Sequence, residues 1–233
     1  MQLSLQTIYN FYVDHPESGW IMKTNNVFQF YKFLKDHNFK KILDLGTGIG
    51  CTAAIMSLVF KEKGVEDYEI HTIEQFKKCY DIAQEIMPEE LKKNVKFYFS
   101  PPVVWNTELI PYVNFTTFKE LPEGDWDLIL VDGPGGWMEN DKYVDIMSGD
   151  VFKMLLENKI KPGTYIAWDG RIKPFQALEK YFGNNFYYVP ISQSDDFNII
   201  ERKEGEVDFV NEELESMKRY GYFKGIESPT NLG

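Results

Sequence analysis

The chain has 233 residues, of which 43% are hydrophobic and 16% aromatic, and its formal net charge is −11. This composition provides for one sizeable folded domain and argues against disorder. The acidic charge argues against a nucleic-acid partner, because phosphate binding needs a basic face, and no run reaches the roughly 18 apolar residues of a membrane span.

The predicted strands and helices alternate along the chain. The expected strands are the short apolar runs 41–45, 68–73, 95–99, 127–131 and 164–168. The expected helices are 27–34, capped by Asn25 or Asn26, then 51–63, 75–87, 149–158 and one that begins near Pro174. Two late strands, 186–191 and 197–202, flank a polar turn and indicate a hairpin. The pattern predicts an α/β fold, Rossmann-like and doubly wound, with a mostly parallel sheet.

We expect a single domain over residues 1–233, with three parts. Residues 1–39 form an N-terminal helical segment that either covers the site as a lid or simply packs on the core. Residues 40–203 form the core, and residues 204–233 form a tail whose acidic part, Glu204 to Glu215, is expected as a solvated helix face.

Cysteine usage and the N-terminus bear on location. Cys51 and Cys79 match neither a disulfide framework nor a metal motif, and residues 1–6 lack a signal-peptide pattern. We therefore expect a cytoplasmic protein without a membrane partner, and leave its oligomeric state open.

The loop after the first strand carries glycines at alternate positions, Gly46, Gly48 and Gly50. The dinucleotide fingerprint G-x-G-x-x-G would need a glycine where Cys51 stands. Asp44, two residues before the first glycine, would repel a pyrophosphate and attract a ligand that carries an ammonium and a sulfonium. The loop favours a sulfonium cofactor, and a nicotinamide-dependent oxidoreductase on the same fold is the alternative.

Residues 44–50, Asp-Leu-Gly-Thr-Gly-Ile-Gly, resemble motif I (D/E-x-G-x-G-x-G) of the class I S-adenosylmethionine-dependent methyltransferases. The resemblance covers about residues 40 to 200 and implies a seven-stranded sheet closed by the antiparallel hairpin. Glu74, at the end of the second strand, falls where this family binds both ribose hydroxyls, and Ser100 falls where it contacts the adenine. The cofactor-binding set that we expect follows the first three strands: Asp44, Gly46, Thr47, Gly48, Gly50, Glu74, Gln75 and Ser100. The other interpretation is a tight strand-to-helix turn beside an incidental Glu74.

The loop after the fourth strand, Asp132-Gly133-Pro134-Gly135-Gly136-Trp137, should border the reaction site, because ligands bind beyond the carboxyl ends of parallel strands. In the resembled family, enzymes that methylate bases or glutamine often carry N/D/S-P-P-aromatic here, which this chain lacks. The run is locally similar to glucuronoxylan O-methyltransferases, which favours a hydroxyl on a sugar-like or other small polar acceptor. Asp132 is the leading candidate to orient the acceptor or take its proton, unless it only caps a turn or contacts the cofactor amine. Trp137 is a candidate wall of the acceptor pocket.

The fifth strand ends in Asp169-Gly170-Arg171. Catechol-type O-methyltransferases hold magnesium with an Asp after strand four and an Asp-Asn pair after strand five. Asp132 and Asp169 match two of these positions, but Gly170 replaces the Asn, so no metal ligand is assigned and a divalent metal stays an alternative. Asp169 is the second catalytic candidate or a cap of the next helix. Arg171 either binds an anion on the acceptor or is a solvated surface residue.

Other reactive side chains have structural interpretations. Cys51, at a helix start, is either a thiol of lowered pKa or a small packing residue. His71 lies inside a strand and is expected to be structural, whereas His15 and His37 are minor candidates for catalysis. The predicted activity is an S-adenosylmethionine-dependent methyl transfer, and a cofactor-binding module without turnover is a further alternative.

Overall fold

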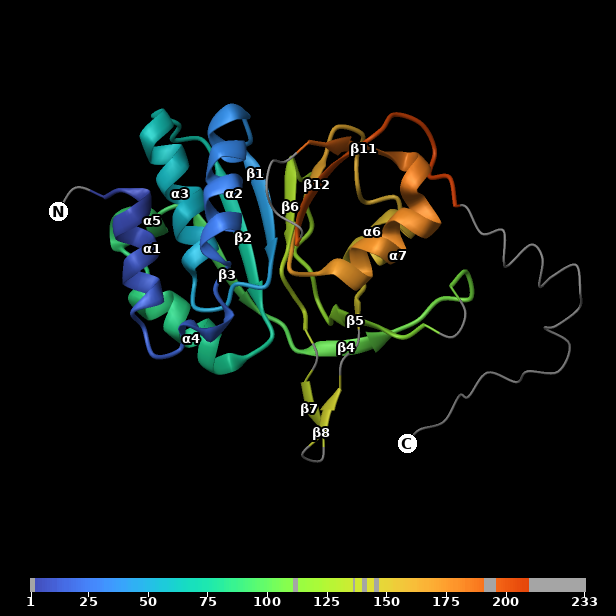
Figure 1. The fold of residues 1–233 in the computed structure, drawn as a ribbon, viewed down its shortest axis with the longest axis horizontal. Helices are drawn as coiled ribbons and strands as arrows, with labels where there is room; N and C mark the ends of the chain where they lie inside the picture. The colour runs from blue at the N-terminus through green and yellow to red at the C-terminus, as the bar shows by residue number, and fades with distance from the viewer. Residues whose placement is uncertain are drawn as a thin grey trace, which may run out of the picture.

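A computed structural model describes residues 3–110, 113–135, 137–139, 142–144, 147–190 and 196–209 of the chain. Its centre is a seven-stranded sheet, shown in Figure 1. The strands are β1 (Lys41–Leu45), β2 (Glu69–Glu74), β3 (Val95–Phe99), β6 (Leu128–Val131), β10 (Tyr165–Asp169), β11 (Phe186–Val189) and β12 (Phe197–Arg202). Their order is β11-β12-β10-β6-β1-β2-β3, in which β12 runs antiparallel to both of its neighbours and all other pairs are parallel. The predicted Rossmann-like sheet with its closing hairpin is confirmed.

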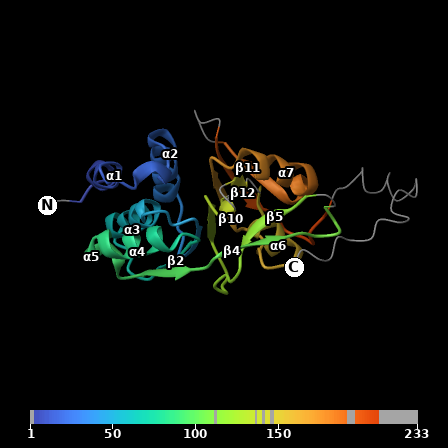
Figure 2. The ribbon, with the colours of Figure 1, turned by 90° about the horizontal axis from the view of Figure 1, so that it is seen from below.

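Helices cover both faces of this sheet (Figures 1 and 2). One face carries α1 (Leu5–Val13), α2 (Thr24–Asp36), α3 (Cys51–Lys63), α4 (Lys77–Ile86) and α5 (Glu89–Lys92). The other face carries α6 (Asp150–Leu156) and α7 (Ile172–Phe182). The single-turn helices η1 (Ser18–Trp20) and η2 (Gly183–Asn185) complete the helical elements of the described residues. None of the described helices is long and apolar enough to span a membrane.

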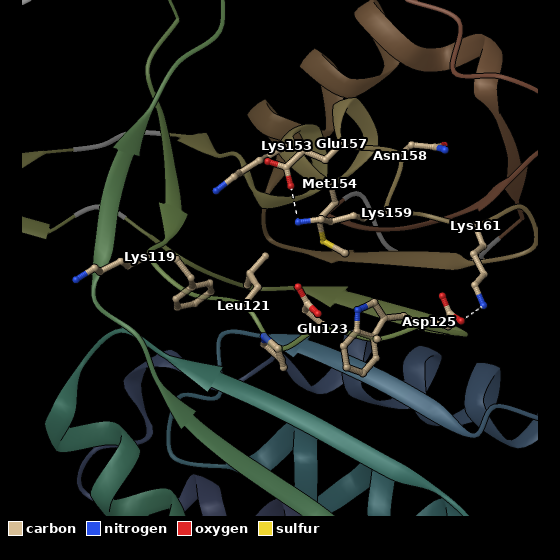
Figure 3. A pocket seen from close by; sticks show the side chains of 14 residues that line it. Lys119, Leu121, Glu123, Asp125, Lys153, Met154, Glu157, Asn158, Lys159 and Lys161 are labelled. Carbon is tan, nitrogen blue, oxygen red and sulfur yellow. Dashed lines mark ion pairs between the residues drawn. The ribbon is translucent and has the colours of Figure 1, made fainter.

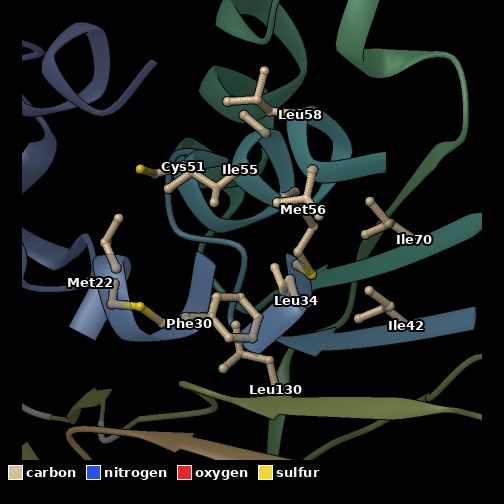
Figure 4. Close-up of a cluster of buried hydrophobic side chains, with 14 of the residues drawn as sticks. Met22, Phe30, Leu34, Ile42, Cys51, Ile55, Met56, Leu58, Ile70 and Leu130 are labelled. Atoms are coloured by element: carbon tan, nitrogen blue, oxygen red, sulfur yellow. The ribbon is translucent and has the colours of Figure 1, made fainter. Parts of the chain in front are cut away.

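The central strands are buried on both faces, which explains their nearly continuous apolar sequences. Ile42 of β1 packs in the cluster on the α1–α3 side, and the next residue, Leu43, packs in the cluster on the α6–α7 side. Both are fully buried. Figure 4 shows the first cluster, in which Phe30 of α2 lies beside Leu130 of β6, and Ile55 of α3 belongs to the same cluster.

The structure differs from the predicted elements in the cap of α2 and in the C-terminal tail. Helix α2 begins at Thr24 with Lys23 at the N-cap and no side-chain cap, so the predicted cap by Asn25 or Asn26 is wrong. The described N-terminal residues form two helices, and α1 packs against α3. The expected helix from Glu204 is wrong for residues 204–209, whose chain is not helical, and residues 210–215 lie outside the described ones.

Two small sheets were not predicted from the sequence. One consists of β4 (Pro102–Trp105), β5 (Phe115–Phe118) and β9 (Met147–Ser148), and the other of β7 (Trp137–Glu139) and β8 (Lys142–Val144). These strands have two to four residues each, too few for a clear alternation of apolar and polar positions.

Candidate functional site

The carboxyl ends of β1, β2, β6 and β10 meet at one edge of the sheet, because these strands are parallel. Asp44, Glu74, Asp132 and Asp169 lie at these ends. The carboxyl group of Asp132 interacts electrostatically with the other three carboxylates and with Arg171. The structure therefore brings the two predicted groups, for cofactor and for acceptor, to one place.

Gly46 of the glycine loop lies directly against the loop after β6, residues 132–137, which we call the acceptor loop. It has φ +115°, and a Cβ built on it would lie 2.7 Å from the Gly133 nitrogen and 2.8 Å from the Asp132 carbonyl carbon. The Gly46 amide donates to the Ile73 carbonyl at 3.0 Å, and the Asp132 amide donates to the Leu45 carbonyl at 2.8 Å. Only glycine permits this approach of two backbones.

The environment of Asp44 is suited to binding a cation. It is fully buried, and its Oδ2 accepts hydrogen bonds from Thr72 at 2.7 Å and Thr52 at 3.2 Å. Its Oδ1 has no hydrogen-bond partner, and burial raises the pKa of the carboxyl to about 7. An ammonium on a ligand would satisfy the unpartnered oxygen and restore the ionised form, so the site fits the amino group of S-adenosylmethionine.

Glu74 faces the same loop. Its Oε2 accepts from the Gly48 amide at 2.7 Å and its Oε1 from the Phe76 amide at 2.8 Å. Burial raises its pKa, against these hydrogen bonds, which lower it. Gln75 donates a third backbone hydrogen bond to this carboxylate. A carboxylate has about four lone-pair sites, so about one is left for a ribose hydroxyl.

The other expected cofactor residues also make contacts within the protein. Thr47 Oγ1 lies 2.6 Å from Thr72 Oγ1, under the loop. Gln75 Oε1 accepts from the Gly135 amide at 2.9 Å, so this side chain reaches the acceptor loop. Ser100 Oγ, at the end of β3, accepts from the Glu120 amide at 2.9 Å. The cofactor contacts expected of these residues stay predictions.

Asp132 and Arg171 form a pair beyond β6. Arg171 Nη2 donates to the backbone carbonyl of Asp132 and lies 3.6 Å from its Oδ1. The Asp132 side chain is 19% exposed. Burial, followed by the charge of Asp169, raises its pKa well above the ordinary range. The Arg171 side chain is 30% exposed, and its Nε is buried without a hydrogen-bond partner. The interpretation of Arg171 as a solvated surface residue is therefore wrong.

Asp169 is held by a residue that the sequence analysis did not select for the site. Asn26 of α2 is buried, and its Nδ2 donates to Asp169 Oδ1 at 2.6 Å and to Asp196 Oδ1 at 3.1 Å. Lys23 forms an ion pair with Asp196. Burial raises the pKa of Asp169 to about 6, and the hydrogen bond from Asn26 opposes that shift. One signal was present, because Asn26 lies four residues before Phe30, on the buried side of the helix.

Trp137, the remaining acceptor candidate, belongs to β7, and its side chain lies outside the described residues. Cys51 is buried, and burial raises the pKa of its thiol to about 12, so the thiol of lowered pKa is a wrong interpretation. Its position among packed side chains is visible in Figure 4.

The histidines have contacts away from these carboxylates. His71 lies 3.0 Å from Glu69 through Nε2, and Tyr98 Oη lies 3.0 Å from its Nδ1. His37 Nδ1 is 2.8 Å from the Phe33 carbonyl, and His15 Nδ1 accepts from the Glu17 amide. Among the described residues, no three or more histidine, cysteine, aspartate or glutamate side chains form a group suited to a metal ion.

Comparison with known proteins agrees with this arrangement. Residues 15–123, slightly less than half of the chain, match the family of protein-L-isoaspartate (D-aspartate) O-methyltransferases. The match includes the glycine loop, Glu74 and Ser100, and ends before Asp132. No curated protein matches the chain in sequence.

Several solved structures share the fold over nearly their whole length. A methyltransferase from Podospora anserina, bound to S-adenosylhomocysteine, is 18% identical with a TM-score of 0.55, over 88% of this chain and 89% of that one. An O-methyltransferase of tomaymycin synthesis from Streptomyces achromogenes, in complex with S-adenosylmethionine, is 11% identical with a TM-score of 0.53, over 88% and 91%. An O-methyltransferase from Bacillus cereus, bound to S-adenosylhomocysteine, is 15% identical with a TM-score of 0.50, over 88% and 93%.

The partial family match is to an O-methyltransferase family, and the solved structures show that the chain has the fold of such enzymes. The chemistry of Asp44 is compatible with the amino group of S-adenosylmethionine, the cofactor expected from the sequence.

Proposed function

We propose that the protein transfers the methyl group of S-adenosylmethionine to a hydroxyl oxygen of a small, polar, sugar-like acceptor. The observation that carries this proposal is Asp132, a partly exposed carboxylate of raised pKa, whose backbone touches the glycine loop at Gly46. Such a carboxylate stands beside the predicted cofactor, and its raised pKa makes its ionised form a stronger base than an ordinary aspartate.

The bound cofactor supplies the activated methyl group, and the protein supplies alignment and a base. Methyl transfer is an in-line displacement, so fixing the acceptor oxygen against the methyl carbon is the main contribution of the site. In the proposed step Asp132 takes the hydroxyl proton while the oxygen bonds to the methyl carbon and the sulfur keeps the electron pair. Asp169, held by Asn26, orients the acceptor from the neighbouring strand end.

The charge of this edge supports a neutral acceptor. Four acids, Asp132, Asp169, Asp44 and Glu74, surround the single Arg171, so the edge has an excess of negative charge when two or more of them are ionised. The matched family is named for an acceptor with a carboxyl group, but the match ends at residue 123, before the acceptor side. A carboxylate acceptor would be repelled here, whereas a hydroxyl would be free to donate a hydrogen bond to Asp132.

The location of the protein is part of the same proposal. Both cysteines, Cys51 and Cys79, are free and buried, which is compatible with a reducing, cytoplasmic environment.

The experiment separates cofactor binding from chemistry. Calorimetry should show S-adenosylhomocysteine binding that is lost in Asp44→Asn and weakened in Glu74→Gln. Asp132→Asn should retain that binding but lose about a hundredfold or more in turnover, measured as labelled methyl transfer to a panel of sugars, polyols and phenols.

Asp36→Asn, an exposed carboxylate at the end of α2, is the matched control and should leave both measurements unchanged. Unchanged turnover in Asp132→Asn would refute its role as base. Methylation of amines or carboxylates alone would refute the acceptor class.

A further inference from the structure

A cavity of about 520 Å³ lies away from the proposed reaction site (Figure 3). Its walls come from the loop 121–126, from α6 and from the segment 158–161. We call it the far-edge cavity. Trp126 stands just before β6, and Lys161 stands between α6 and β10, so the cavity lies at the amino ends of these parallel strands. Asp132 lies at the other end of β6, about 20 Å away along six extended residues.

The interior of the far-edge cavity has an apolar surface. Leu121, Trp126 and Met154 line it, and Trp126 and Met154 belong to the hydrophobic core on the α6–α7 side. The backbone of the loop rests on the indole, because a Cβ built on Gly124 would lie 2.8 Å from Trp126 Cζ2. This contact holds the loop against the ring and gives the cavity a wall of defined position.

Charge is divided unequally between the two ends of the cavity. At one end Lys161 pairs with Asp125. Lys159 pairs with Glu157 at 2.7 Å, and Figure 3 shows this pair near Lys153. Figure 3 shows Lys119 and Lys153 at the opposite end.

Neither Lys119 nor Lys153 has an ion-pair partner within 4.0 Å among the described residues. The lining holds four lysines against three carboxylates, Glu123, Asp125 and Glu157, so the cavity has an excess of one positive charge in a protein of net charge −11.

We propose that the far-edge cavity binds a small organic anion, with a flat apolar body against Trp126, Met154 and Leu121 and its anionic group between Lys119 and Lys153. Binding sites for small molecules combine such an apolar lining with a few placed polar groups, and an ammonium pair selects a carboxylate or sulfonate. This site is separate from methyl transfer and does not depend on the acceptor proposed above.

The probe is 1-anilinonaphthalene-8-sulfonate, which joins an aromatic body to one sulfonate. It should bind saturably, with enhanced fluorescence, to the full chain loaded with S-adenosylhomocysteine. The double variant Lys119→Gln/Lys153→Gln should weaken this binding about tenfold, because two charge-assisted contacts are lost. Leu121→Ala should weaken it through loss of apolar contact. Hydrogen exchange should slow on binding in residues 119–126 and 153–161.

The matched control is Lys32→Gln/Lys93→Gln, which removes two exposed lysines elsewhere and makes the same change in net charge. It should bind the probe as wild type does, and thermal unfolding should show all variants folded. Equal probe affinity in the two double variants would overturn the proposal. So would complete displacement of the probe by S-adenosylhomocysteine, or protection confined to other residues.

Discussion

At the scale of single residues, Gly46 decides whether the two halves of the site fit together. Its α-carbon stands where the backbones of the glycine loop and the Asp132–Gly133 segment touch, so no side chain has room there. Most tight turns require glycine only because of its positive φ, whereas position 46 also has no room for a Cβ.

Gly46→Ala should therefore destabilise the protein by about 3 kcal/mol, from a strained φ and a forced backbone shift. The control is Gly64→Ala, because Gly64 also has positive φ, at +67°, but no atom within 4 Å of the added carbon. This control should cost about 1 kcal/mol. Urea denaturation of both variants measures the difference, and equal costs would show that the close approach is unimportant.

Asp44 makes cofactor binding depend on pH. Its carboxyl has a pKa of about 7 in the free protein, and a ligand ammonium binds the ionised form. Binding must then release a proton below pH 7. We expect the affinity for S-adenosylhomocysteine to rise about tenfold from pH 6 to pH 8. The raised pKa of Glu74 acts in the same direction.

Calorimetry in buffers of different ionisation enthalpy counts the released proton. An affinity that stays constant or falls between pH 6 and pH 8 would contradict the assignment of Asp44.

At the scale of elements, α2 connects the N-terminal segment to the acceptor side. Asn26 on its first turn bonds Asp169 of β10 and Asp196, just before β12. The helix is therefore part of the candidate site as well as a cover for the sheet.

Asn26→Ala should cost about 1–2 kcal/mol in the free energy of unfolding, because it leaves a buried carboxylate oxygen without its donor. We also expect reduced turnover with little change in S-adenosylhomocysteine affinity, since the contact lies on the acceptor side. Asn25→Ala is the matched control, an exposed residue one position earlier on the same helix. If the two variants behave alike in denaturation and turnover, Asn26 does not position Asp169.

At the scale of the whole molecule, cofactor binding should stabilise the fold, since the pocket needs β1, β2 and β6 in register. S-adenosylhomocysteine at about 100 times its Kd should add about 2.7 kcal/mol, which raises the Tm by about 5–10 °C for a chain of this size. Differential scanning fluorimetry measures this shift. Asp44→Asn should show none, and an equal shift in that variant would place the ligand elsewhere.

Much of the fold followed from local patterns. β1, β3 and α3 begin and end at the predicted residues, because the two strands are short, mostly apolar runs and the helix lies between Gly50 and Gly64. β4, β5 and β9 were not predicted, because such short strands owe their form to contacts with one another. The expected positions of Asp44, Glu74, Asp132 and Asp169 at strand ends followed from strand order alone.

The sequence by itself determined which cofactor class we expect and at which edge of the sheet we expect it to bind, because glycine spacing and the acids at strand ends are local features. Only the tertiary structure decided how these groups act together. It placed Asn26 against Asp169 across 143 positions of the chain. It also paired Arg171 with Asp132, and buried Asp44 deeply enough to raise its pKa. Burial and charge pairing depend on which distant segments share a space, and no local pattern records that.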